Sequence, residues 1–154
     1  MRRSPVLALT VGLSRPARWL RWLAPAAWMG LMSFVSQQSS PPEPRLPSGL
    51  LAFLGGHEDK LFHFVEFAIL AMLLRLALGT ARPKLRALLM VVVGCALFAA
   101  TDEVHQAFVP GRDASPLDGL TDVAGAVSGL LLTHWVLGWA RYRLGRLSQS
   151  GRIL

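Results

Sequence analysis

The chain has 154 residues, of which 53% are hydrophobic and only 16% are charged, so it has room for one domain. Soluble domains carry about a quarter charged residues, and each helix of a soluble bundle needs a polar face, so the long apolar runs found here disfavour a soluble bundle. A net charge of +7 would indicate a nucleic-acid partner in a soluble protein. The basic residues lie beside apolar runs, however, where orientation in a membrane explains them, and we expect no nucleic-acid partner.

Four apolar runs follow one another along the chain. The first spans residues 19–35 and the second spans residues 61–79. The third is free of charge over residues 87–101 and continues through polar residues to Phe108, whereas the fourth, residues 123–140, has no Asp, Glu, Lys or Arg. A membrane-spanning helix needs about 20 residues, so the third run is long enough only if its polar extension is helical. We predict an all-α fold, a four-helix transmembrane bundle surrounded by the lipid bilayer.

The basic residues predict how this bundle is oriented. Twelve of the sixteen Lys and Arg residues lie in the N-terminal flank, between the second and third runs, or in the C-terminal tail. Four spans with alternating flanks then satisfy the positive-inside rule. This pattern predicts a basic cytoplasmic N-terminus over residues 1–18, a membrane domain over residues 19–140 and a basic cytoplasmic tail over residues 141–154.

The acidic residues follow the opposite pattern. All nine Asp and Glu residues lie outside the membrane or in the outer half of a predicted helix. A charge near the bilayer centre costs at least about 2.5 to 3.5 kcal/mol, so an embedded charge is a functional hypothesis by default. Asp59, His63 and Glu66 are spaced i, i+4 and i+7, which places them on one helix face. Asp102 and Gln106 share a face at the outer end of the third helix.

The start of the fourth helix continues this polar face. Asp118 and Asp122 are four residues apart, and Gly125 and Gly129 continue nearly the same stripe as a small-xxx-small pattern that allows another helix to approach closely. The polar stripe is therefore predicted to face the bundle interior. Asp118 also has a structural role open to it, because Ser115 and the proline after it predict a turn into a helix whose first turn favours an acid.

These patterns predict one polar cluster at the outer end of the bundle. It comprises Asp59, Lys60, His63, Glu66, Asp102, Glu103, Gln106, Arg112, Asp118 and Asp122. Six desolvated carboxylates facing two permanent cations cannot all be ionised. A divalent cation, shared protons or a cationic ligand group would each neutralise them. Oxygen-rich sites suit Mg²⁺, Ca²⁺ or Mn²⁺, and the candidate metal ligands are Glu66, Asp102, Glu103 and Asp122.

Two separated motifs in the same cluster resemble a known family. Residues 59–67 read DKLFHFVEF, and residues 101–125 read TDEVHQAFVPGRDASPLDGLTDVAG. Together with the end of the first helix at residues 28–38, they resemble the VanZ-like family over roughly residues 20–140. The resemblance implies a multi-pass protein of the bacterial inner membrane connected with the cell envelope. The family's namesake is linked to low-level resistance to the glycopeptide teicoplanin, and the resemblance implies no particular reaction.

Three functions are compatible with the cluster. The first is a binding or accessory protein whose outward pocket engages an envelope precursor, a lipid-linked saccharide or a glycopeptide. The second is an embedded enzyme acting on a lipid-linked intermediate. In that enzyme His63 or Glu66 would be the general base, and Lys60 or Arg112 would hold a phosphate or carboxylate. No nucleophile with a base at fixed spacing and no metal-binding motif supports the enzyme.

The third hypothesis is structural, with charged residues forming interhelical pairs that fix the helix register. In this case Arg112 would pair with Asp102 or Asp118. The hypotheses separate at Glu66, because Glu66→Gln would abolish function in a binding or reacting site but would reduce stability in a purely structural one. His134, near the middle of the fourth run, is interpreted as a hydrogen-bonded packing residue.

Overall fold

A computed structural model describes most of the chain. The described residues are 19–39, 47–49, 55, 57–79, 83–112 and 114–150. Within them the chain forms helices joined by turns and contains no strand, which confirms the predicted all-α class. The predicted cytoplasmic N-terminus, residues 1–18, lies outside the described residues.

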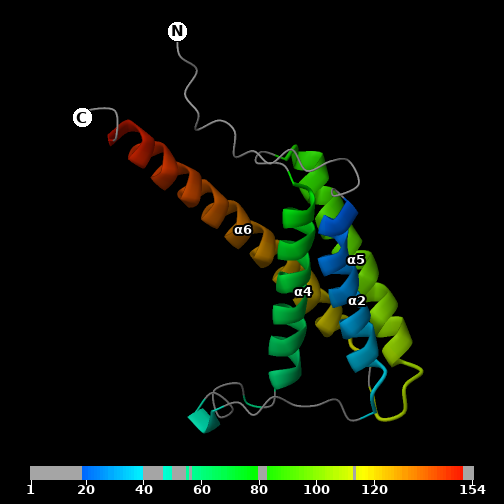
Figure 1. The fold of residues 1–154 in the computed structure, drawn as a ribbon. Coiled ribbons are helices and arrows are strands. Elements are labelled where there is room, and N and C mark those ends of the chain that lie inside the picture. Colours follow the sequence, from blue (N-terminus) through cyan, green and yellow to red (C-terminus); the bar gives the residue numbers. More distant parts are fainter. Residues whose placement is uncertain are drawn as a thin grey trace.

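Four α-helices lie within the described part of the chain, and a short 3-10 helix precedes the first of them. The elements are η2 (Leu20–Trp22), α2 (Leu23–Ser36), α4 (Glu58–Ala77), α5 (Leu85–Gln106) and α6 (Pro116–Ser150). Successive α-helices run in alternate directions, and α6 crosses α4 at a steep angle (Figure 1). The first turns of α4 and α6 and the last turn of α5 consequently lie at the same end of the bundle (Figure 1).

The helix boundaries agree with the apolar runs and extend three of them, the fourth run most of all, because α6 reaches from Pro116 to Ser150. The polar continuation of the third run is helical through Gln106, as its length required. Helix α4 begins at Glu58, three residues before its apolar run. Pro25 is the third residue of α2, where a missing backbone N–H costs no hydrogen bond. Together η2 and α2 measure about 27 Å, close to the thickness of about 30 Å of a bilayer's hydrocarbon core.

Two of the described helices are long and apolar enough to cross a membrane by length and composition. They are α5 and the Pro116–Arg146 part of α6. Helix α4 has 20 residues, but Lys60, Glu66 and Arg75 interrupt its apolar character. Helix α4 contacts η2, α2, α5 and α6, which places it at the centre of the bundle.

Small residues determine how closely α4 and α6 approach. A Cβ atom added at Gly125 would collide with the backbone carbonyl of Phe64, and one added at Gly129 would collide with that of Ala68. Close backbone approach at a small-xxx-small stripe is typical of membrane helix pairs. The predicted role of the two glycines is therefore confirmed. Cys95, fully buried in α5, belongs to the adjoining apolar core.

Beyond this crossing α6 leaves the other helices. At 35 residues it is about 52 Å long, well beyond the hydrocarbon thickness. Trp135, Trp139 and Tyr142 are exposed along it, and the Arg143 guanidinium lies 5.5 Å from the centre of the Trp139 ring. His134 is exposed too. The interpretation of His134 as a hydrogen-bonded packing residue is therefore wrong. The preceding Thr133 is still buried, so His134 is exposed because it lies on the face of α6 that points away from the other helices.

Candidate functional site

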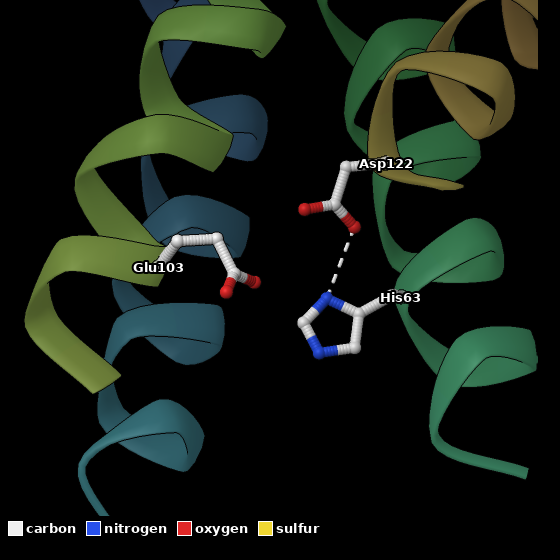
Figure 2. Close-up of side chains that lie close together, drawn as sticks. All are labelled: His63, Glu103 and Asp122. Atoms are coloured by element: carbon white, nitrogen blue, oxygen red, sulfur yellow. Dashed lines mark hydrogen bonds and ion pairs between the residues drawn. The ribbon is translucent and has the colours of Figure 1, made fainter. Parts of the chain in front are cut away.

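A buried histidine and a buried aspartate join α4 to α6 near the start of both helices. His63 Nδ1 and Asp122 Oδ1 are joined by a hydrogen bond of 3.0 Å, and the Asp122 side chain is 0% exposed (Figure 2). The close approach of Gly125 to Phe64 lies directly beside this pair. Since Phe64 follows His63 and Gly125 is one helical turn after Asp122, the same helix crossing that needs glycine also sets the His63–Asp122 distance.

Glu103 brings a third helix to the same place. One ligand atom from each of His63, Glu103 and Asp122 can be chosen so that all three atoms lie within 4.8 Å of one another. Figure 2 shows the Glu103 carboxylate of α5 facing the pair formed by α4 and α6. Glu103 Oε2 accepts a hydrogen bond of 2.6 Å from the backbone N–H of Ser115, which ties the end of α5 to the chain entering α6.

Two oxygens of this cluster are buried without a partner among the described residues. They are Asp122 Oδ2 and Glu103 Oε1. An unsatisfied buried acceptor costs about 1–3 kcal/mol, and native structures contain few of them, so each needs an explanation. Two carboxylates placed this close also repel each other when both are ionised. A positively charged or hydrogen-bonding group bound between these two oxygens would therefore stabilise the cluster.

A lysine bridges α4 to α6 at the mouth of the site. Lys60 Nζ lies 2.7 Å from Asp118 Oδ1 and 3.1 Å from Asp59 Oδ2. The Asp118 side chain is 8% exposed, whereas that of Asp59 is 56% exposed, so the Asp118 pair is the more strongly desolvated. Asp118 also lies in the first turn of α6, as the structural role inferred for it from the sequence predicted.

The pairing predicted for Arg112 is wrong. Among the described ion pairs, Asp118 is joined to Lys60, and Asp102 Oδ2 instead accepts a hydrogen bond of 2.8 Å from Gln106 Nε2. The one-turn spacing of Asp102 and Gln106 on α5 makes their local hydrogen bond easy to form, while Lys60 reaches Asp118 across the helix crossing. Neither acid needs the Arg112 side chain.

A cavity of about 270 Å³ lies between the end of α2 and the last turns of α5. It is lined by Ser33, Gln37, Phe98, Thr101, Asp102 and His105. Ser33 and Gln37 were not among the candidate residues. Their i, i+4 spacing at the polar end of the first run was the available signal, because two polar side chains on one face at a helix end indicate a polar neighbour.

The predicted site residues therefore fall into separate groups. His63, Glu103 and Asp122 meet in the buried cluster. Glu66 is half-buried and lies one turn further along α4, where its charge still interacts with those of His63, Asp122 and Arg112. It is not part of the three-residue group. The candidate ligand set thus gains His63, whereas Glu66 and Asp102 lie outside it.

The arrangement defines a small helical membrane protein with buried ionisable side chains at one end of its bundle. The family model VanZ/LLP1 matches residues 18–137, and the chain belongs to the VanZ/LLP1 family. The match includes every helix that contributes to the cluster. No curated protein and no solved structure shows significant similarity to the chain.

Proposed function

We propose that the chain is a multi-pass protein of the bacterial inner membrane that binds a polar group of an envelope component at its outward end. The ligand is a lipid-linked precursor or a glycopeptide, and the role is binding or accessory rather than structural. One observation carries the proposal: side chains of three different helices, His63, Glu103 and Asp122, meet in a buried place with unsatisfied oxygens. Stability alone does not favour such an arrangement.

The distribution of charge supports the outward orientation. The cluster lies where α4 and α6 begin and α5 ends, and the basic segments flank the opposite helix ends, as with Arg86 in the first turn of α5 and Arg141 late in α6. Basic segments remain on the cytoplasmic side of bacterial membranes. Both termini then lie in the cytoplasm, and the cluster opens toward the periplasm or cell exterior.

The cavity supports a polar headgroup as the ligand. Its volume of about 270 Å³ is just below the range of about 300–1,000 Å³ for sites that enclose a drug-sized molecule, so it suits a sugar, phosphate or carboxylate better than a whole lipid. Of the residues predicted for the polar cluster, Asp102 lines the cavity, whereas His63, Glu103 and Asp122 do not. Acyl chains of the same ligand would stay in the bilayer.

A deletion strain tests this proposal. The strain is complemented with the wild-type chain, with Glu103→Gln, and with Glu58→Gln as a matched control, a half-buried residue at the start of α4 that lies outside the three-residue group. We expect the wild type and the control to restore the same teicoplanin susceptibility and the same level of lipid-linked precursors, and Glu103→Gln to fail at equal expression. Full complementation by Glu103→Gln would reject the proposed site.

One observation favours an enzyme as the second candidate. A buried carboxylate that orients a histidine, as Asp122 does for His63, is the arrangement that positions a general base. In this version His63, rather than Glu66, activates a hydroxyl group of the ligand or water. Turnover of a lipid-linked intermediate by the purified protein, abolished in His63→Gln, would favour the enzyme; unchanged intermediate with tight binding would favour the binding role.

A further inference from the structure

We propose that His63, Glu103 and Asp122 together bind one transition-type divalent cation, Zn²⁺ or Mn²⁺, at the outward end of the bundle. The inference deepens the proposed function, and it rests on that proposal only because both use the same three residues. Three side chains from α4, α5 and α6 each offer one ligand atom, and these atoms lie within 4.8 Å of one another. Figure 2 shows the three side chains converging from separate helices.

The unpartnered oxygens provide the independent indication of a ligand. Asp122 is 0% exposed, yet its Oδ2 has no hydrogen-bond partner among the described residues. In Figure 2 this oxygen points away from His63 and toward the side on which Glu103 lies. Glu103 Oε1 is buried and unpartnered as well. A cation between the two carboxylates would satisfy both oxygens at once.

The existing distances need little adjustment. Two ligands about 2.0 Å from a tetrahedral Zn²⁺ ion are about 3.3 Å apart, and His63 Nδ1 lies 3.0 Å from Asp122 Oδ1. Cation binding would therefore replace the proton in this hydrogen bond without separating α4 from α6. Glu103 has the longer side chain and is only half-buried, so a change in its rotamer completes the set.

The donor atoms indicate the class of cation. Mg²⁺ and Ca²⁺ favour sites made of oxygen ligands, whereas imidazole nitrogen suits Zn²⁺ and other transition metals, with Mn²⁺ accepting carboxylates readily. His63 supplies that nitrogen. Three protein ligands also leave at least one coordination position open. A phosphate or carboxylate of the bound envelope component would take this position.

The charges around the cluster agree with a cation there. The nearest lysine, Lys60, is engaged by Asp118 and Asp59, so it does not neutralise Glu103 and Asp122. Asp102 lies close enough to add its negative charge to that around Asp122. The local field therefore favours a cation over a neutral or anionic group in contact with these two carboxylates.

Metal content of the purified full-length chain tests the inference. The protein in detergent is incubated with Zn²⁺, Mn²⁺, Mg²⁺ or Ca²⁺ alone, desalted, and measured by elemental analysis and by its melting temperature with and without chelator. We expect about one Zn²⁺ or Mn²⁺ per chain and a higher melting temperature that the chelator reverses. Glu103→Gln should weaken metal binding at least tenfold. The matched controls His57→Asn, at an exposed residue, and Glu58→Gln, at a half-buried one, lie outside the three-residue group and should bind as the wild type does.

Three outcomes would overturn the inference. They are a wild-type chain without stoichiometric metal, metal retained equally in Glu103→Gln, and binding of Mg²⁺ or Ca²⁺ in preference to Zn²⁺ and Mn²⁺. The wild-type measurement decides even if Glu103→Gln fails to fold. If the chain binds metal but its deletion does not change the envelope phenotype, the proposed function is rejected and the cation site is retained. If the protein contains no metal but the phenotype depends on Glu103, the cation site is rejected and the proposed function is retained.

Discussion

His63 and Asp122 are 59 residues apart in the chain, yet His63 Nδ1 lies 3.0 Å from Asp122 Oδ1 and joins α4 to α6. The bond lies beside one of the two close approaches of these helices, where Gly125 meets the backbone of Phe64. Because the bond belongs both to the ionisable cluster and to the packing of the bundle, most substitutions here would change stability and function together. The two effects are separated by comparing substitutions that keep the hydrogen bond with substitutions that remove it.

Substitution of Asp122 makes this separation. Asp122→Asn retains an oxygen that accepts a hydrogen bond from His63, whereas Asp122→Ala leaves the buried His63 N–H without a partner. We expect Asp122→Ala to be less stable than Asp122→Asn by about 1–3 kcal/mol, seen as a lower melting temperature in detergent. Asp122→Asn should fold and still fail to complement. Equal stability of the two variants would show that the hydrogen bond does not hold the helices.

The glycine contact predicts a strong position dependence along α6. Gly129→Ala places a methyl group against the backbone of Ala68, which cannot move aside, and should destabilise by about 1–3 kcal/mol. Gly138→Ala on the same helix meets nothing within 4 Å and should be neutral or stabilising by up to about 1 kcal/mol, because alanine is the better helix former. Melting temperatures of the two variants provide the comparison. Similar values would contradict the close crossing of α4 and α6.

The two ion pairs of Lys60 should differ in strength. The Asp118 side chain is 8% exposed and that of Asp59 is 56% exposed. A double-mutant cycle with Lys60→Met should give a coupling of about 0.5–3 kcal/mol for Asp118→Asn and less than about 1 kcal/mol for Asp59→Asn, because exposed pairs are screened by water. The cycle is measured from unfolding in detergent at low salt. A stronger coupling of Lys60 to Asp59 than to Asp118 would contradict the assignment of Asp118 as its main partner.

Orientation in the membrane is tested by cysteine labelling. Ala114 is exposed between α5 and α6, and Tyr142 is exposed late in α6. We expect a membrane-impermeant maleimide to label Ala114→Cys in intact cells and to label Tyr142→Cys only after lysis. The native Cys95 is 0% exposed and gives the background. The opposite labelling pattern would place the cluster on the cytoplasmic side and remove the proposed ligands.

Several features could be predicted from local patterns alone. The apolar runs predicted the α-helices, the glycine spacing predicted the close face of α6, and the turn at Ser115 predicted where that helix begins. The candidate residues of the cluster were also found this way, because charges in apolar surroundings are costly enough to be conspicuous. The pairing of Arg112 and the surroundings of His134 were predicted wrongly. Lys60 of another helix engages Asp118 and Gln106 engages Asp102, and His134 lies on the exposed face of α6; these contacts depend on which helix faces meet.

The sequence by itself determined that this chain is helical, that its helices are apolar, and that its acids gather at one end, because helix period and the cost of embedded charge act within each segment. Only the tertiary structure decided that the side chains of His63, Glu103 and Asp122 meet in one buried group, whereas those of Glu66 and Asp102 lie outside it. That choice follows from the crossing of α4 and α6, since a change in angle or height at Gly125 and Gly129 would bring different turns of the helices together.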